Sequence, residues 1–407
     1  IGGNFGLQFT GTGGQFNNLA GGTTILSGVY GLPFYNSGVN GTFSNAGALN
    51  KTSASTQSFH VINTGTINVS TGMMELTGAW TNAAGTINLS GGVLGLGGNF
   101  TTAAIPLGSI NRTGGALNLT GVLDNTGSTL DIGSAGIFGA GGLGTLSGKI
   151  TGGTITGTTL TSASGTLNNV IIGSNLSESG TLFITNGLTL ASGVTVNKGN
   201  STWYFDGQST GQAAGTVHHL ATQGSSTVTS TGGALNIYAA NGQILQIDSG
   251  VTVQGYGTLS HYWAGSIINA GTLISDTAGQ TFTISPTNFT NDTTGVVRAT
   301  LGTTNISAAN FTSNAGSLLE VNGGTLTLSP TLWNGASNLN LTAGILNMDT
   351  AFSAASLGTY TRTGGTFNIG VSGNLDNTAT LLDVNAGLFG AGGLGTLSGK
   401  ITGGTIT

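Results

Sequence analysis

The stretch NTGTINVSTGMMELTG, residues 63–78, contains the pattern that decides the fold of this chain. In Ile67-Asn68-Val69 an apolar, a polar and an apolar residue follow one another. This period of two places alternate side chains on opposite faces of a β-strand. Gly, Ser and Asn flank the triplet and favour turns. The local unit that the sequence predicts is therefore a short strand between tight turns.

The same triplet recurs along the whole chain. Helical periodicity is absent, and the chain contains only three Glu and four Lys, so we expect no helix of any length. The further triplets are Leu117–Leu119, Leu188–Leu190, Val194–Val196, Leu235–Ile237, Val251–Val253, Leu326–Leu328 and Phe367–Ile369.

The turns between the strands are periodic as well. Asn45, Asn63 and Asn82 each begin an Asn-x-Gly phrase or a variant of it, with steps of 18 and 19 residues. A second run, which begins at Asn291, has steps of 23 and 20 residues. A spacing of about 20 residues is typical of one coil of a solenoid. Such coils stack about 4.8 Å apart through parallel strand hydrogen bonds, with apolar residues inside and asparagine ladders at the corners. The sequence thus predicts an all-β fold, a parallel β-helix with coils of about 20 residues.

A longer repeat contains the short one. The segment FGAGGLGTLSGKITGGTIT occupies residues 138–156 and again residues 389–407. Asp124 and Asp376 are 252 residues apart in matching contexts, which indicates a long unit of about 250 residues. We therefore expect one continuous β-solenoid over 1–407. Within it, 1–156 is a partial long repeat and 157–407 a full one, in an array that continues beyond both ends.

Composition excludes several classes of protein. Only 5% of the residues are charged and 37% are apolar, which argues against disorder. The 76 glycines come with only four prolines and no strict period, so a collagen helix is excluded. Seven basic residues are too few for a nucleic-acid surface, and the chain has no cysteine for disulfides or thiolate metal sites. No apolar run approaches the ~18 residues of a membrane span.

Three segments carry a family resemblance. Residues 43–78, 165–196 and 244–275 resemble the strand repeats of bacterial secreted surface proteins, namely filamentous-haemagglutinin-like adhesins and autotransporter passengers. The resemblance implies a right-handed parallel β-helix, export to the cell surface, and an adhesive, stalk or matrix role.

Two glycine-rich segments partly match nucleotide-binding sequence motifs. Gly139–Gly144 and Gly390–Gly395 match G-x-G-x-x-G, but that fingerprint requires a following helix, and here strand triplets follow. Gly144–Lys149 has one residue too few between its glycines for a phosphate loop, and Ile150 stands where Ser or Thr is needed. We interpret both segments as turns.

The few charged residues suggest structural roles. Parallel β-helices include polysaccharide-degrading enzymes, which need clustered acids. Here Asp124 and Asp131 recur in the second copy as Asp376 and Asp383, and Arg112 and Lys149 recur as Arg362 and Lys400. A catalytic site is usually built once, whereas a structural device is copied. We therefore expect turn caps and exposed salt links, with no catalytic, cofactor or metal site and no enzymatic activity.

Histidines and aromatic residues offer the remaining candidate sites. His218 and His219 point to opposite faces of a strand, so together with His261 they do not form a metal site. We expect Trp203 and Phe205 in the core with Tyr204 outward, and Trp80 and Trp333, at matched repeat positions, as core or corner plugs.

The function that the sequence favours is a structural, extracellular rod or fibre on a bacterial surface. Its expected partners are the neighbouring repeats, other copies and surface glycans. One alternative is an adhesin that binds a receptor or glycan through inserted loops, with candidates at Tyr30–Tyr35 and Ser260–Trp263. The other alternative is a polysaccharide-degrading β-helix enzyme.

Overall fold

A computed structural model describes residues 7–9, 14–36, 39–40, 42–82, 84–102, 110–206, 211–239, 242–335 and 337–407. The chain divides into two compact units, Ile1–Leu176 and Ser177–Thr407. The fold is an all-β, parallel β-solenoid of about 16 turns with about 22 residues in each coil. The predicted fold class is confirmed, with coils slightly longer than the expected 20 residues.

The first unit consists mainly of short strands joined by tight turns, and its strand β20 is longer. Its strands are β1 (Leu7–Phe9), β2 (Gln15–Asn18), β3 (Thr23–Leu26), β4 (Phe34–Asn36), β5 (Val39–Asn40), β6 (Thr42–Asn45), β7 (Ala48–Lys51), β8 (Thr56–Asn63), β9 (Thr66–Val69), β10 (Met73–Leu76), β11 (Thr86–Leu89), β12 (Val93–Leu96), β13 (Asn99–Thr101), β14 (Ile110–Arg112), β15 (Ala116–Leu119), β16 (Val122–Asp124), β17 (Thr129–Asp131), β18 (Lys149–Thr151), β19 (Thr154–Thr156) and β20 (Thr159–Ile172). The next strand, β21 (Leu176–Leu190), begins at the last residue of this unit.

The second unit contains several longer strands and two short 3-10 turns. Its further strands are β22 (Thr195–Gly199), β23 (Thr202–Asp206), β24 (Val217–Thr222), β25 (Ser226–Ala239), β26 (Ile244–Ile247), β27 (Val251–Trp263), β28 (Ser266–Asn269), β29 (Thr272–Ser275), β30 (Thr281–Ile284), β31 (Asn288–Asn291), β32 (Val296–Ala299), β33 (Thr303–Ile306), β34 (Asn310–Ser313), β35 (Leu318–Leu328), β36 (Leu332–Gly335), β37 (Asn338–Met348), β38 (Ala351–Ser353), β39 (Thr359–Arg362), β40 (Thr366–Ile369), β41 (Asn374–Asp376), β42 (Leu381–Leu382), β43 (Leu394–Leu397), β44 (Lys400–Thr402) and β45 (Thr405–Ile406). The 3-10 turns are η3 (Ala355–Leu357) and η4 (Gly387–Phe389).

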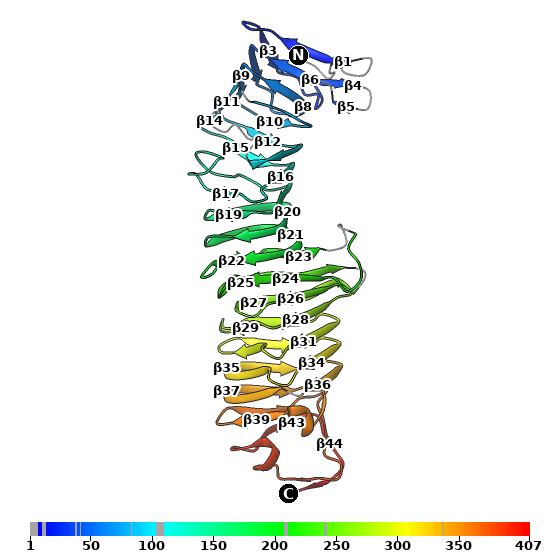
Figure 1. The fold of residues 1–407 in the computed structure, drawn as a ribbon. Helices are drawn as coiled ribbons and strands as arrows, with labels where there is room; N and C mark the ends of the chain where they lie inside the picture. Colours follow the sequence, from blue (N-terminus) through cyan, green and yellow to red (C-terminus); the bar gives the residue numbers. More distant parts are fainter. Residues whose placement is uncertain are drawn as a thin grey trace. The chain divides into compact units, whose positions relative to one another are not determined.

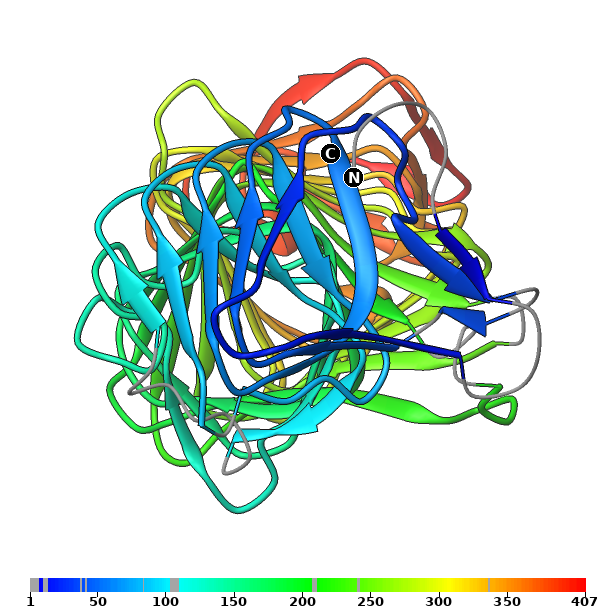
Figure 2. The same cartoon turned by 90° about the horizontal axis from the view of Figure 1, so that it is seen from above.

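In the first unit the strands form stacks in which each strand pairs with strands of the neighbouring coils. One stack runs β2-β6-β8-β10-β12-β15 and another β3-β7-β9-β11-β14 (Figure 1, blue to cyan). Seen from above in Figure 2, these blue and cyan coils lie over one another. Every strand pairing described in this unit is parallel except the β4–β5 hairpin. Parallel pairing follows because each coil passes over the previous one in the same direction.

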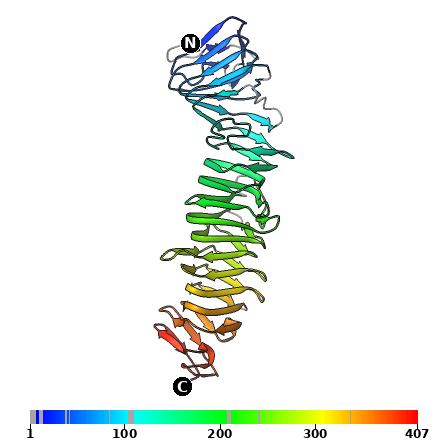
Figure 3. The same cartoon turned by 90° about the vertical axis from the view of Figure 1, so that its left-hand side faces the viewer.

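The second unit has three stacks of parallel strands, one for each face of the coil. They run β22-β25-β27-β29-β32-β35-β37, β23-β25-β27-β30-β33-β35-β37-β40 and β24-β26-β28-β31-β34-β36. The long strands β25, β27, β35 and β37 belong to two stacks because they bend around a corner. Figure 3 shows these strands one below another, from green to orange.

Inward-facing apolar residues fill the space between the faces. Ile67 pairs in register with Ile87, and both side chains are fully buried. In the second unit Phe289, Phe311 and Trp333 stack along three successive coils, with ring centroids 5.3 and 6.3 Å apart. The apolar positions of the triplets are buried wherever the structure describes their side chains. The predicted period of two is therefore confirmed.

Asparagine ladders hold the corners together. In the first unit Asn18 donates to Asn45 (2.7 Å), Asn45 to Asn63 (2.7 Å) and Asn63 to Asn82 (2.5 Å), and all four side chains are buried. The glycines of the first two motifs lie against the previous coil, since a Cβ on Gly47 or Gly65 would lie 2.3 or 2.2 Å from the carbonyl oxygen of Gly22 or Gly47. At Asn45 and Asn63 the Asn-x-Gly motif thus supplies a buried amide and a position without room for a Cβ, and the expected ladders are confirmed.

Candidate functional site

The duplicated segment builds the same loop in both units. Arg112 donates from Nη1 to the carbonyl oxygens of Phe138 (3.4 Å) and Gly142 (2.6 Å). Its Nε and Nη2 donate to the Gly115 oxygen at 3.3 and 2.9 Å. The planar guanidinium suits this task because it presents several donors in a fixed fork.

Arg362 repeats the arrangement in the second unit. Its Nη1 donates to Phe389 (2.9 Å) and Gly393 (2.6 Å), and Nε and Nη2 donate to the oxygens of Gly364 and Gly365. The salt links that we expected for these arginines are wrong, because their partners are backbone carbonyls. The two ion pairs found among the described residues are His219–Asp248 and Arg298–Glu320.

The duplicated aspartates cap turns, as the sequence predicts. Asp124 Oδ1 accepts the Thr126 N–H at 2.9 Å, and Asp376 accepts that of Thr378 at the same distance. Hydrogen bonds from the hydroxyl and N–H of these threonines lower the pKa of both carboxyls. Asp131 likewise accepts the Gly133 N–H at 2.7 Å.

The glycine motifs form turns, as predicted. Gly139, Gly141 and Gly142 have φ of 65°, 90° and 62°, which favours glycine. The Gly142 N–H donates to the Gly139 oxygen at 2.8 Å and closes the turn. No helix follows this segment in residues 145–206, so the arrangement lacks the helix N-terminus that binds a pyrophosphate.

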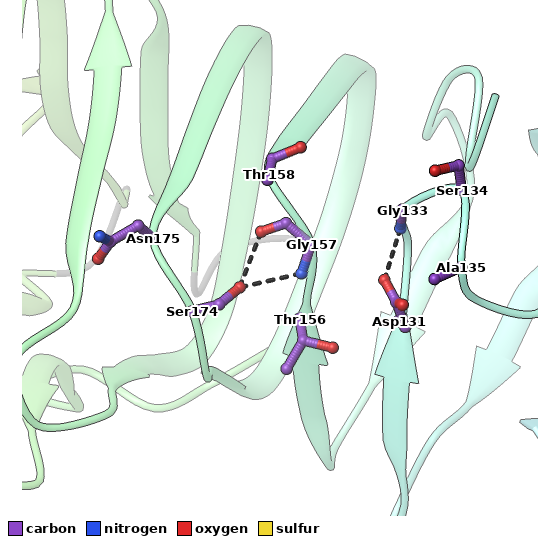
Figure 4. Close-up of a pocket in the computed structure, with 9 residues that line it drawn as sticks. All are labelled: Asp131, Gly133, Ser134, Ala135, Thr156, Gly157, Thr158, Ser174 and Asn175. Atoms are coloured by element: carbon purple, nitrogen blue, oxygen red, sulfur yellow. Dashed lines mark hydrogen bonds between the residues drawn. The ribbon is translucent and has the colours of Figure 1, made fainter.

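A surface pocket of about 500 Å³ lies next to the first copy of this loop (Figure 4). Asp131 and Ser134 line one side, and Ser174 and Asn175 the other. Ser174 Oγ donates to the Gly157 oxygen at 2.8 Å and lies 2.9 Å from the Gly157 N–H. The side chains that line it are Asp, Ser, Ala, Thr and Asn.

The chemistry available in this pocket is hydrogen bonding. Asp131 is the one carboxylate among the lining residues, so the pocket lacks the pair of acids that glycoside hydrolysis requires. It contains no histidine or lysine that would act as a partner base for a serine nucleophile. Among the described residues, no group of three metal-ligating side chains is present either.

The three histidines singled out in the sequence lie in different environments. His218 is buried, and its Nε2 lies 3.0 Å from Gln243 Oε1. Burial lowers the pKa of His218, and so favours the neutral ring. His219 faces outward and lies 2.9 Å from Asp248 Oδ1, and His261 Nε2 lies 3.4 Å from Thr287 Oγ1. The structure thus places the adjacent histidines on opposite faces, as predicted.

A buried polar cluster in the second unit was not predicted. Lys198 is fully buried, and its Nζ donates to the carbonyl oxygens of Ser201 (2.5 Å) and Gly232 (2.9 Å). Glu178 is also buried and accepts the Trp203 indole N–H at 2.8 Å. Burial lowers the pKa of Lys198 to about 8, although the charge of Glu178 opposes the shift, and burial raises the pKa of Glu178. Because both charged side chains and Trp203 are buried, we assign the cluster to the core.

The aromatic predictions are largely confirmed. Trp203 and Phe205 are buried, and Tyr204 faces outward, where it stacks on Phe183 at 5.2 Å. Trp333 is a core residue, whereas Trp80 is half-buried and donates to the Gly97 oxygen at 2.8 Å.

The two candidate binding loops have different outcomes. Within Tyr30–Tyr35, residues 30–33 lie outside the strands, as predicted for a loop. Phe34, however, begins strand β4, is fully buried and packs on Phe43 at 4.7 Å, so the prediction is wrong from Phe34 onward. Ser260–Trp263 is the end of strand β27, so the prediction of a loop is wrong here, but Tyr262 and Trp263 are 47% and 61% exposed. The second candidate is therefore accessible to a ligand.

One outer face of the second unit forms an uncharged grid. Its two columns come from β30, β33, β35, β37 and β40, which pair in register. Two amide contacts run along it, from Asn347 to Thr327 (3.4 Å) and from Asn368 to Asn347 (3.0 Å). The grid residues are Thr281, Thr283, Thr303, Asn305, Thr325, Thr327, Ile345, Asn347, Thr366 and Asn368.

Comparison of the chain with protein-family models, with curated proteins and with solved structures gave no match. The resemblance to secreted surface proteins is supported at the level of the β-solenoid fold. None of the helical turns in the described residues has the length and apolar character that crossing a membrane requires.

Proposed function

We propose that this chain is a section of a structural, extracellular β-solenoid that forms a rod or fibre on a bacterial surface. The observation that carries the proposal is the duplication of a stabilising device. Arg112 and Arg362 anchor the same loop through equivalent carbonyl oxygens, although 250 residues separate them in the sequence. Copying of this kind serves an extended array, because each repeat contacts only its neighbours.

Lateral association through the uncharged grid is the second part of the proposal. The grid has neither a positive nor a negative side chain, so a second copy meets it without desolvating a charge. Thr and Asn side chains offer donors and acceptors in a regular array, which matches the same array on another copy. The role is non-enzymatic, which agrees with the lone carboxylate in the Asp131 pocket.

Electron microscopy of the native material tests the rod. A unit of about 250 residues with about 22 residues per coil contains about 11 coils. At ~4.8 Å per coil the axial repeat is about 55 Å. We expect long filaments with that repeat and a layer line near ~4.8 Å. Short discrete particles would contradict the proposal.

Light scattering at rising salt concentration tests the lateral contact. Because the grid carries no charge, association should change little between about 0.05 and about 1 M NaCl, although the Debye length falls from above ~10 Å to about 3 Å. Thr325→Lys places a charge on the grid and should disperse bundles. Thr272→Lys, on a different face, is the matched control and should leave them intact. Bundles that resist Thr325→Lys would exclude the grid as the contact.

Turnover assays address the enzymatic alternative. Incubation with pectins, alginates and capsular polysaccharides should yield no new reducing ends. Cleavage that Asp131→Asn abolishes would overturn the structural role.

A further inference from the structure

Strand β27 ends in an exposed aromatic pair. Tyr262 and Trp263 have ring centroids 5.8 Å apart, with 33° between the ring planes. Among the side chains that the structure describes, these two are the exposed aromatic ones. The other aromatic side chains that the structure describes are buried or half-buried, so the end of β27 is exceptional in exposing two aromatic rings.

The backbone holds Trp263 in an unfavourable conformation. Its φ of 93° lies in the left-handed region, which is an outlier for a bulky side chain. The other non-glycine residues with positive φ in the described part of the chain are small or are asparagine, namely Ser164, Asn169, Asn186 and Ala379. A glycine would satisfy this turn without strain, so the presence of tryptophan points to a use for its ring.

A column of uncharged polar side chains begins three residues after Trp263. Asn288 donates to Ser266 Oγ at 3.1 Å, and Asn310 donates to Asn288 Oδ1 at 2.9 Å. These residues open strands β28, β31 and β34, which pair in register on one face, and both asparagines are exposed. The column therefore presents hydroxyl and amide groups to solvent, one coil apart.

The surroundings distinguish a sugar from other ligands. A hot spot for a protein partner is enclosed by contacts that exclude water, whereas this pair borders an open polar column. An acidic glycan needs cations, but Lys198 is buried and Arg298 is paired with Glu320. A neutral sugar ring offers an apolar face to an aromatic ring and hydroxyl groups to amides.

We propose that Tyr262 and Trp263 form a stacking platform for a neutral glycan, and that Ser266, Asn288 and Asn310 hydrogen-bond the adjoining sugar residues. The site goes beyond the structural role, because a rod needs no exposed tryptophan. It would join the solenoid to a neutral polysaccharide around it.

Binding of neutral oligosaccharides to the full chain tests this site. The probes are cello-, xylo-, manno- and chito-oligosaccharides, and quenching or enhancement of tryptophan fluorescence gives the Kd. We expect at least one series to bind, with Trp263→Ala weakening binding tenfold or more and Asn288→Ala weakening it severalfold. Leu332→Ala, an exposed apolar position next to Asn310 in register, is the matched control and should leave Kd unchanged.

A second variant separates ligand binding from packing. Trp263→Gly removes the ring and relieves the positive φ, so it should abolish binding while the Tm stays the same or rises. A lower Tm would show that the ring serves the fold and would overturn the platform. Three other outcomes would also overturn the platform. They are that none of the four oligosaccharide series binds the folded wild type, that Trp263→Ala binds equally well, or that the site prefers an acidic glycan or a protein. Filaments should persist in every variant, so loss of the site and loss of the structural role are distinguishable.

Discussion

Replacing Asn63 by alanine should destabilise the corner of its coil far more than replacing Asn68, five residues later. Both amides belong to asparagine ladders with similar bond lengths. Asn63 accepts from Asn45 at 2.7 Å, and Asn68 donates to Asn50 at 2.7 Å. They differ in burial, since Asn63 is 1% exposed and Asn68 faces outward.

The expected magnitude follows from the buried hydrogen bond that is lost. In Asn63→Ala, Asn82 Oδ1 loses its 2.5 Å donor in a buried corner, whereas the Gly65 oxygen keeps the Thr86 N–H at 2.8 Å. Loss of one buried donor costs about 1–3 kcal/mol. Asn45 keeps other acceptors, the Gly47 and Thr66 oxygens, and adds little. Water replaces the lost partners in Asn68→Ala, which should cost about 0.5 kcal/mol or less.

Native-state hydrogen exchange is the suitable assay. Because each coil of a solenoid contacts mainly its neighbours, a local defect appears as local opening, and a single global transition would average it. At about 1.4 kcal/mol per tenfold, protection of amides in residues 63–66 should fall about 5- to 150-fold in Asn63→Ala and about twofold in Asn68→Ala. Equal losses in the two variants would refute the argument that burial sets the strength of the ladder.

Three further predictions concern charges and glycine. Lys198 has a pKa of about 8 in the folded state and about 10.4 in the unfolded state, so the unfolded state binds more protons between these pH values. The free energy of unfolding should therefore rise with pH across this range, by on the order of 3 kcal/mol. Lys198→Met should remove that pH dependence in denaturation between about pH 8 and about pH 10.5, and an unchanged pH dependence would contradict the assignment. Arg362→Ala should raise hydrogen exchange in residues 387–394 and lower the free energy of unfolding by about 2–4 kcal/mol, because several carbonyls lose a charged donor. Arg298→Ala, at a surface ion pair, should lower it by about 1 kcal/mol or less. Similar losses in the two variants would show that the loop does not depend on Arg362. Gly65→Ala should prevent close stacking on Gly47 and lower the denaturation midpoint clearly, and a midpoint equal to that of the wild type would show that the coil adjusts.

The period of two predicted the fold because burial alternates with it in most of the short strands. Each residue of Ile67-Asn68-Val69 lies on the face that the pattern assigns. The same parity could have identified the buried lysine, because Lys198 continues the inward positions of Val194 and Val196. Its charge argued for the surface, and the acceptors that make burial tolerable come from Ser201 and from Gly232 of the next coil. Sequence periodicity does not reveal such acceptors.

Loop contacts were harder to predict than strands. The arginines were expected to pair with acids, since charge is visible in a sequence and carbonyl direction is not. Two loop carbonyls converge on Arg112 only because positive φ values at Gly139, Gly141 and Gly142 fold the loop back over it. Trp263 was named as a candidate within its segment, but its exposure depends on how far β27 extends beyond the coil.

Comparison of the two copies of the long repeat shows which residues recur in both and which occur in one copy alone. Arg112 and Asp124 have counterparts at offsets of 250 and 252 residues. Both arginines donate to the matched carbonyl oxygens of the loop, and both aspartates accept the N–H of the threonine two residues later. At the offset of 251 that relates Phe138 to Phe389, the sequence GT at positions 11 and 12 corresponds to the aromatic pair at 262 and 263. The long repeat therefore does not require aromatic residues at these positions. The exposed tryptophan with a φ of 93° is therefore particular to this coil and is not copied in the long repeat. The neutral polar column that begins at Ser266 is the reason for proposing a glycan as its ligand.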